Sequence, residues 1–264
     1  MVGVRAVAPG GHVAMCVVAF GLALGLTPCL AASESVPGAR PVGTTVLAKR
    51  QVTGLLGSDE RQLKAGHRVH RDELIRTGSQ AQVEFNLDDN TKLALGPDAE
   101  LRLDEFAVGG GGDAKSIAVR LLKGTLRFLT GRHSSESYKI ETPSATIGVR
   151  GTIFDLYIGP HGETFVLLHK GEVEVCSRSQ NCRSHRRVGR VVQVTPLGLV
   201  SAPVKWTADL VHGVGVAQAF PFVGRRLVVD PVRRLTHKSI TEPLKGLNQG
   251  GKAIERTLKK ILPF

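Results

Sequence analysis

The 264-residue chain is predicted to be a mainly β protein, folded as an antiparallel β-sandwich or β-roll. Apolar and polar residues alternate along most of the chain from residue 46, which is the period of strands. Turn residues separate the alternating segments, and their spacing gives about a dozen short strands without intervening helices. Neighbouring segments share a loose apolar-polar-apolar form that ends in glycine, so a stack of β coils is the alternative architecture.

The first 32 residues have the pattern of a secretory signal peptide, with Arg5, an uncharged apolar run over 13–26 and small residues around Ala31 and Ala32. This run is shorter than the roughly 20 residues that a spanning helix needs. We therefore expect a cleaved leader (1–32), a flexible mature start (33–45) and a periplasmic or secreted protein. The alternatives are a lipoprotein modified at Cys29 and a leader that stays uncleaved as a membrane anchor.

The predicted β domain covers residues 46–195. Between two of its strands, Asp88, Asp89 and Asn90 predict a hairpin turn rather than a calcium site, since the sequence lacks the rest of a calcium loop. The strands with the clearest boundaries are 83–87, 92–95, 101–103, 116–122, 125–129, 138–141, 145–149, 152–158, 164–169, 171–176 and 188–194.

The cysteines agree with export. Cys16 and Cys29 lie in the leader, so the mature chain keeps only Cys176 and Cys182. These two flank a short polar, basic segment that can close a hairpin, and an oxidising compartment favours a disulfide between them. A redox or metal site is the alternative, but zinc would require further Cys or His residues at ligand spacing.

The net charge of +12 is concentrated in the C-terminal part of the chain. Residues 32–176 carry 18 Lys and Arg against 19 Asp and Glu, whereas residues 177–264 carry 16 against 4. An exported protein meets little nucleic acid, so we expect no nucleic-acid partner. A protein, a cell-envelope polymer or anionic lipid is the partner that this charge distribution favours.

Residues 196–264 are predicted to form a basic C-terminal extension. A short helix is expected over 206–219 and irregular structure over 220–236, around Pro221 and Pro231. Near 252–262 the spacing predicts an amphipathic helix. This helix either attaches the protein to an anionic membrane or polymer, or packs on the β domain. Its candidate attachment residues are Lys252, Arg256, Lys259 and Lys260.

The most specific motif lies between residues 142 and 154, and its residues are Thr142, Pro143, Gly148, Val149, Arg150, Gly151, Thr152 and Phe154. This motif resembles the signature of the FecR domain. Stretches 66–79, 85–95 and 171–175 resemble other elements of that family, so the resemblance covers about residues 46–195.

The residue types in the signature suggest local roles. Pro143 marks a strand start or edge, and Gly148 and Gly151 allow a bulge or a close backbone crossing. A guanidinium in the apolar setting of Arg150 needs a partner, for which Asp155 or Glu141 is a candidate. Arg150 is therefore either a ligand anchor or a structural clamp.

The resemblance implies periplasmic sensing. FecR-like proteins pass a signal from an outer-membrane transporter to a cytoplasmic sigma factor, through one membrane helix and a cytoplasmic anti-sigma segment. Only residues 1–12 precede the apolar run, so we expect this chain to lack that segment. The expected function is an extracytoplasmic recognition module that binds a protein or cell-envelope partner. The alternatives are a membrane-anchored regulator of a sigma factor or transporter, and an envelope-attachment protein.

We expect no enzymatic activity and no cofactor. The sequence shows no nucleophile with a base, no carboxylate pair and no metal cluster at spacings that could converge. His67 and His70 lie in a basic turn region without nearby ligands, and the glycine run 109–112 lacks the Lys and Ser or Thr of a phosphate loop.

Overall fold

The computed structural model describes residues 40–107, 115–131, 138–211 and 213–241. All of them belong to Pro37–Phe264, the second of two units into which the chain divides. The described residues contain fourteen strands, one 3-10 helix and two short α-helices. The strands are β1 (Pro41–Lys49), β2 (Val52–Leu56), β3 (Asp59–Gln62), β4 (Arg68–His70), β5 (Leu74–Thr77), β6 (Gln82–Leu87), β7 (Lys92–Leu95), β8 (Glu100–Ala107), β9 (Lys115–Leu129), β10 (Tyr138–Glu141), β11 (Ala145–Ile158), β12 (Thr164–Ser177), β13 (Cys182–His185) and β14 (Val191–Val194).

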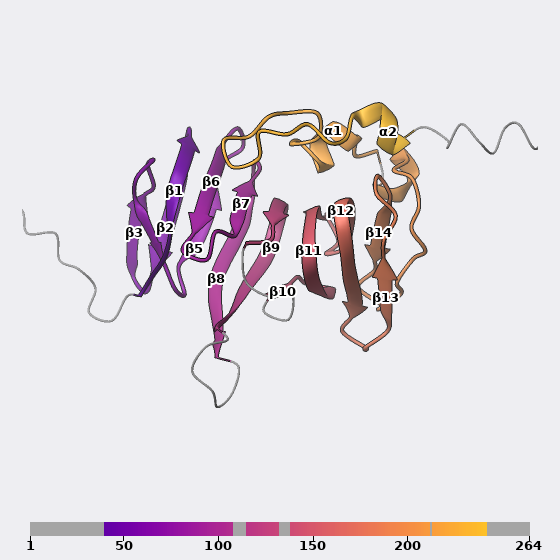
Figure 1. Ribbon diagram of the computed structural model, residues 1–264, viewed down its shortest axis with the longest axis horizontal. Helices are drawn as coiled ribbons and strands as arrows, with labels where there is room; N and C mark the ends of the chain where they lie inside the picture. Colours follow the sequence, from indigo (N-terminus) through magenta and orange to yellow (C-terminus); the bar gives the residue numbers. More distant parts are fainter. Residues whose placement is uncertain (1–39, 108–114, 132–137, 212, 242–264) are drawn as a thin grey trace, which may run out of the picture. The chain divides into compact units, whose positions relative to one another are not determined.

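The strands form one continuous hydrogen-bonded sheet that is folded into two layers (Figure 1). Layer A contains, in order, β4, β1, β6, β7, the second half of β9, the second half of β11, the first half of β12 and β14. Layer B contains β3, β2, β5, β8, the first half of β9, β10, the first half of β11, the second half of β12 and β13. Among the described strand pairs, β9 with β10 is parallel and the others are antiparallel.

Three long strands pass from one layer to the other, and each bends at a glycine with positive φ: Gly124 in β9, Gly151 in β11 and Gly171 in β12. A Cβ atom at Gly124 would lie 2.6 Å from the Cα atom of Ala99, and one at Gly171 would lie 2.7 Å from the carbonyl oxygen of Gly151. A side chain does not fit at either of these two bends, so the layer crossing depends on these glycines.

The main hydrophobic core lies between the two layers. Phe85, Phe128 and Phe154 of layer A pack in one cluster with residues such as Leu101 and Ile147 of layer B. The rings of Phe128 and Phe154 are stacked with centroids 5.4 Å apart. Alternation places these side chains inward along each strand, and each fully buried side chain of this size contributes about 1.5–3 kcal/mol.

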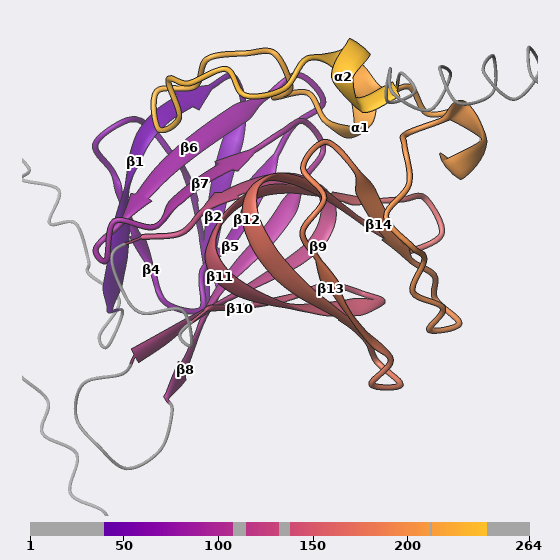
Figure 2. The same cartoon turned by 45° about the vertical axis from the view of Figure 1, so that its right-hand side comes forward.

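Residues 202–241, except position 212, are called the strap below, and they cross the outer face of layer A (Figures 1 and 2). The strap contains the 3-10 helix η1 (Ala208–Val211) and the helices α1 (Val216–Ala219) and α2 (His237–Thr241). Trp206 of the strap packs edge-on against Phe165 of β12 and Phe220 of the strap, with centroids 5.4 and 5.1 Å away. No helix in the described part of the chain has the length and apolar character to cross a membrane.

The mainly β class is confirmed. Three of the predicted strand pairs prove to be single strands, because the breaks at 123–124, 150–151 and 170 are bends inside β9, β11 and β12. The short polar strands β3, β4 and β13 have no alternating apolar residues, so the sequence pattern does not predict them. β1 begins at Pro41, inside the predicted flexible start, because it pairs there with β4 and β6.

The strap is largely irregular, as predicted for 220–236. The single helix predicted over 206–219 is wrong, because only η1 and α1 form there, separated by Gly213 and Gly215. Glycine is unfavourable in a helix interior by about 1 kcal/mol, which accounts for the interruption. The predicted amphipathic helix with Lys252, Arg256, Lys259 and Lys260 lies outside the described residues.

Candidate functional site

The first half of the signature forms the turn between β10 and β11. Thr142 is buried; its amide donates to the carbonyl oxygen of Ala145, and its Oγ1 accepts from the Ala145 amide, both at 2.9 Å. Its hydroxyl also lies 2.7 Å from that of Thr164, at the start of β12. Pro143 lies in the turn between β10 and β11, where its missing N–H group costs no hydrogen bond between strands. Thr142 thus holds the β10–β11 turn against β12.

The second half of the signature builds the layer crossing of β11. Thr152 Oγ1 donates to the carbonyl oxygen of Glu172 at 2.6 Å, and Phe154 is fully buried in the core. Gly151 has the positive φ expected of a bulge, but Gly148 has regular strand geometry with ordinary space for a Cβ, so its predicted special role is wrong. The side chain of Arg150 lies outside the described residues.

Asp155 and Glu141, the candidate partners that the sequence suggests for Arg150, pair with other residues. Asp155 binds Arg127 and His169, whereas Glu141 binds Arg120 and Lys139. Hydrogen bonding by Lys139 and then Arg120, against the opposing effect of burial, lowers the pKa of Glu141.

A groove with a volume of about 690 Å³ opens beside the signature turn. The strap contributes one wall, the bend of β9 contributes another, and the β11–β12 loop contributes a third. Four prolines and Tyr157 give the groove an apolar lining, with Asp98 and Lys123 at exposed positions. The lining residues are Ser79, Pro97, Asp98, Leu122, Lys123, Gly124, Thr125, Pro143, Tyr157, Ile158, Gly159, Pro160, Gly162, Ala217, Gln218 and Pro221.

Tyr157 is the aromatic residue of the groove lining. Its ring packs against Phe165, Trp206 and Phe220, with centroids 6.0 to 6.4 Å away. Burial, with a smaller contribution from the negative charge of Glu163, raises the pKa of Tyr157. The phenol therefore stays neutral at physiological pH and can act as a hydrogen-bond donor.

A cluster of charged side chains is buried between layer A and the strap. Arg127 of β9 donates to both carboxylate oxygens of Asp155 of β11, at 2.6 and 2.8 Å. His169 Nε2 lies 3.0 Å from the Asp155 carboxylate, and Asp230 of the strap lies 3.6 Å from Arg127. Arg234 pairs with Asp230 on the strap side.

This cluster ties the strap to the sheet electrostatically. Burial alone would raise the pKa of Asp155, but the charges of Arg127 and His169 outweigh burial and hold it well below its ordinary value. Burial alone would lower the pKa of Arg127, but the negative charges of Asp155 and Asp230 outweigh burial and raise it. Paired and hydrogen-bonded to each other, the Arg127 guanidinium and the Asp155 carboxylate stay ionised in the interior. We call Arg127, Asp155, His169 and Asp230 the buried charge cluster.

Sequence reasoning missed the buried charge cluster. Alternation places Arg127 and Asp155 on the outer face of the sheet, where a charged residue ordinarily meets water. The available signal was the unbroken apolar run 165–168 in β12, because such a run is typical of a strand that is covered on both faces.

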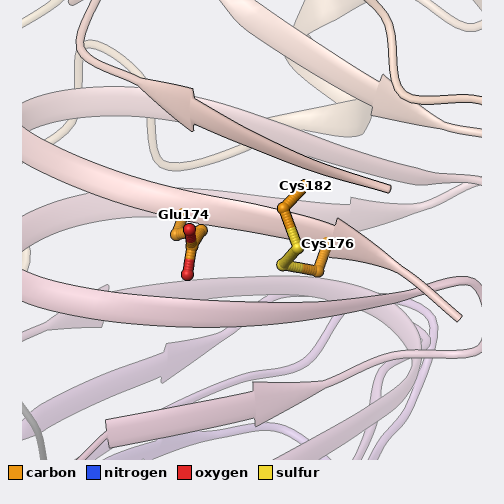
Figure 3. A group of neighbouring side chains, drawn as sticks. All are labelled: Glu174, Cys176 and Cys182. Carbon is orange, nitrogen blue, oxygen red and sulfur yellow. A yellow bond between two sulfur atoms is a disulfide. The ribbon is translucent and has the colours of Figure 1, made fainter. Parts of the chain in front are cut away.

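The predicted disulfide is confirmed: Cys176 and Cys182 are bonded across the β12–β13 hairpin, with Cα atoms 4.0 Å apart (Figure 3). Glu174 lies close enough for its carboxylate and the two sulfurs to form a potential metal-binding group. Both sulfurs are consumed in the disulfide, however, so they offer no thiolate to a metal. The group is therefore structural in this state.

The described residues define an all-β domain with a folded, disulfide-stabilised sheet. Residues 73–174 match the family model described as FecR protein, so the chain carries a FecR domain over that segment. The match supports a signalling or regulatory role. A search among curated proteins gives no match.

Two crystal structures, each of a "putative anti-sigma factor" from Parabacteroides distasonis, are similar to the chain. The first is 18% identical with a TM-score of 0.40, covering 48% of this chain and 57% of its own. The second is 12% identical with a TM-score of 0.41, covering 68% of this chain and 90% of its own. The chain thus spans little more than half of the first structure, and neither likeness is close enough to assign a role to individual residues.

Proposed function

We propose that the chain is an extracytoplasmic, non-enzymatic recognition module of FecR type, which binds a protein partner in a signalling or regulatory system. The observation that carries this proposal is the position of the signature turn. Pro143 forms part of the groove wall, together with the strap and the β9 bend. The FecR match supplies the regulatory context in which such a groove would hold a protein segment.

The groove suits an extended peptide segment. Its volume falls within the range of about 300–1,000 Å³ that is typical of ligand pockets. Proline rings and the Tyr157 ring provide rigid apolar contacts, which lose little conformational freedom on binding. Asp98 and Lys123 are exposed and of opposite charge, so they can orient a segment that carries complementary charges.

The proposal predicts that a charged side chain at an apolar position of the groove abolishes partner binding. Leu122 lines the groove with 38% of its surface exposed, whereas Val228 is 60% exposed on the strap and does not line the groove. Leu122→Asp is the test variant, and Val228→Asp is the matched control for adding a charge at an exposed apolar position.

The experiment captures partners from envelope extracts with wild type and both variants, followed by mass spectrometry. The proposal expects an envelope signalling or transport protein that wild type and Val228→Asp retain and Leu122→Asp loses. Equal recovery by all three proteins, or no partner beyond that of an unfolded control, would refute the groove as the binding site. Matched unfolding curves check that both variants are folded.

The extracytoplasmic location is tested separately at the N-terminus. Mass measurement of the chain from its native host is expected to show cleavage near Ala32. An intact N-terminus would favour the alternative, in which the run 13–26 stays as an anchor for a membrane-bound regulator of a sigma factor or transporter. The capture experiment on the groove measures partner binding whether or not the leader is cleaved.

A further inference from the structure

Two turns of the same design lie side by side at one end of the folded sheet. In the first turn, at 177–181, the Gln180 amide donates to the Ser177 carbonyl oxygen at 3.0 Å. The Ser177 amide donates to the Asn181 carbonyl oxygen at 2.9 Å. In the second turn, at 195–199, the Gly198 amide donates to the Thr195 carbonyl oxygen at 2.9 Å. The Thr195 amide donates to the Leu199 carbonyl oxygen at 3.0 Å. Gln180 and Gly198 occupy equivalent positions, and both have positive φ.

The two turns are joined to each other. The Asn181 side-chain amide donates to the carbonyl oxygen of Gly198 at 3.5 Å, and a Cβ atom at Gly198 would collide with the Ser179 hydroxyl. The disulfide Cys176–Cys182 closes the base of the first turn. Figure 2 shows the β12–β13 hairpin and the loop after β14 protruding in the same direction. We call residues 177–181 and 195–199 the paired turns.

The paired turns present leucines to solvent. Leu197 is 89% exposed and Leu199 is 66% exposed, the two highest values among the large apolar residues of the described chain. Pro196 fixes φ at the first central position of the second turn, and Gly198 supplies the positive φ after it. The backbone is thus held by its own hydrogen bonds in a form that keeps Leu197 at the apex.

Cationic side chains flank the leucines. Arg178 lies in the first turn and Arg183 follows the disulfide, both exposed and without an ion pair among the described residues. From Arg183 a cationic surface continues along β13 to the β13–β14 loop and the start of the strap. The cations lining its two adjoining hollows are Arg183, Arg186, Arg187, the buried Arg190 and the half-buried Lys205. Arg186 pairs with Glu172 at 2.7 Å, and no carboxylate among the described residues lines either hollow.

We propose that the paired turns and this cationic surface dock the protein on an anionic phospholipid bilayer. Leu197 and Leu199 would enter the interfacial region, and Arg178 and Arg183 would lie at the level of the lipid phosphates. β13 carries the chain from Cys182 to His185, about 10 Å at about 3.3 Å per residue, and Arg186 and Arg187 follow its end. They would therefore lie at or above the headgroups, within reach of the surface potential.

The combination of groups selects this partner. A soluble polyanion would use the arginines and leave both leucines in water, whereas an apolar protein groove would accept the leucines and leave the arginines unpaired. An anionic bilayer satisfies both, because it places apolar chains beneath a layer of phosphates. This site is separate from the groove, so membrane docking and partner binding can fail independently.

The test is sedimentation of the purified chain with vesicles of phosphatidylcholine alone and of phosphatidylcholine mixed equally with phosphatidylglycerol. Wild type is expected to bind the mixed vesicles preferentially, and less as salt rises. The Leu197→Ser/Leu199→Ser variant should lose binding at least about ten-fold, from the apolar area that it withdraws. Each of Arg178→Gln and Arg183→Gln should lose binding about five-fold.

Matched controls come from the strap. Val228 and Val232 are also exposed apolar residues, at 60% and 52%, and Val228→Ser/Val232→Ser should bind as wild type does. In a second measurement, the Leu197→Trp variant should shift its fluorescence to shorter wavelength only with the mixed vesicles, since Trp206 is already buried.

Three results would overturn the proposal. They are equal binding of wild type to both vesicle types, unchanged binding by the leucine variant, and an emission maximum of the Leu197→Trp variant that does not move. Binding to soluble polyphosphate that the leucine variant retains in full would instead assign the surface to a polymer. Thermal unfolding of each variant is expected to match wild type, because every substituted residue is exposed.

Discussion

The outer faces of layers A and B differ in what covers them. On layer B, charged residues alternate with core residues and pair in water, as Arg120 with Glu141 and Arg76 with Glu100. On layer A, the outward positions of β9 and β11 hold Arg127 and Asp155, which are almost fully buried beneath the strap. Charged side chains point outward from both layers, but only those of layer A are shielded from water.

This difference separates two physical regimes for the same residue types. Exposed ion pairs contribute about 0–1 kcal/mol, because water screens both charges. Breaking a buried pair costs about 3–5 kcal/mol, because the remaining charge is left without a partner in the interior. The strap therefore converts an ordinary outer face into a second interior, and layer A should be far more sensitive to substitution than layer B.

Substitution of Arg127 is expected to have the largest effect. Arg127→Ala should lower the free energy of unfolding by about 3–5 kcal/mol, because Asp155 and Asp230 lose their cation. Arg120→Ala on layer B, the matched control, should cost no more than about 1 kcal/mol. Denaturant unfolding measures both, and equal losses would show that the strap does not desolvate layer A.

Substitution of Phe220 tests the apolar part of the same interface. Phe220 is fully buried between the strap and layer A and lies next to Trp206. Phe220→Ala should cost about 3–4 kcal/mol and expose the strap to proteolysis. Val228→Ala, at an exposed strap position, should change neither stability nor the cleavage pattern. A Phe220→Ala protein with wild-type stability would contradict the packing described here.

Removal of the disulfide should have a smaller effect. The bond between Cys176 and Cys182 closes a loop of only a few residues, so Cys176→Ala/Cys182→Ala should cost about 2 kcal/mol. Thermal unfolding with and without reductant gives the comparison, with the double variant insensitive to reductant. A loss as large as that of Arg127→Ala would mean that the hairpin supports more of the fold than its position indicates.

The pH dependence should show two windows. Burial lowers the pKa of His185 below 6.5, against the hydrogen bond to the Arg190 carbonyl, and Nδ1 has no hydrogen-bond partner among the described residues. As the pH falls below 6.5, the unfolded state binds the proton first, so stability decreases until the folded-state pKa is reached. The lowered pKa of Asp155 gives a second loss below about pH 4.

Variants assign each window. His185→Gln should remove the loss that begins near pH 6.5 and leave the acid loss in place. Asp155→Asn, in an already destabilised protein, should reduce the acid loss to the part that the lowered pKa of Glu141 contributes. Unfolding curves across about pH 3–7 measure both windows. Unchanged pH profiles in these variants would assign the titration to other groups.

The sequence predicts the strands of both layers better than it predicts the cover of layer A. Alternation in 83–87 and 138–141, and the turn at Asn90 with its positive φ, correspond directly to the structure, because both are local signals. The strap contact depends on Thr125, Glu84 and Arg127 meeting residues 94 to 145 positions later. Such pairings leave no local pattern, so neither the buried charge cluster nor the groove wall formed by the strap could be predicted.

The FecR signature shows the same limit. Its glycine bulge at Gly151 follows from residue type, because positive φ favours glycine. The neighbouring Gly148 has the same residue type but regular strand geometry, and only the structure distinguishes them. Likewise, the paired turns become a single feature only when the fold brings 177–181 beside 195–199.

The strap forms an integral layer over the outer face of layer A. Hydrogen exchange at the amide of Val229, which donates to the buried carboxylate of Glu84 at 2.9 Å, tests this directly. Slow exchange is expected, comparable to that of core amides in β7 and β11, although Val229 lies in irregular backbone. Exchange at the rate of an exposed loop would show that the strap is not an integral layer.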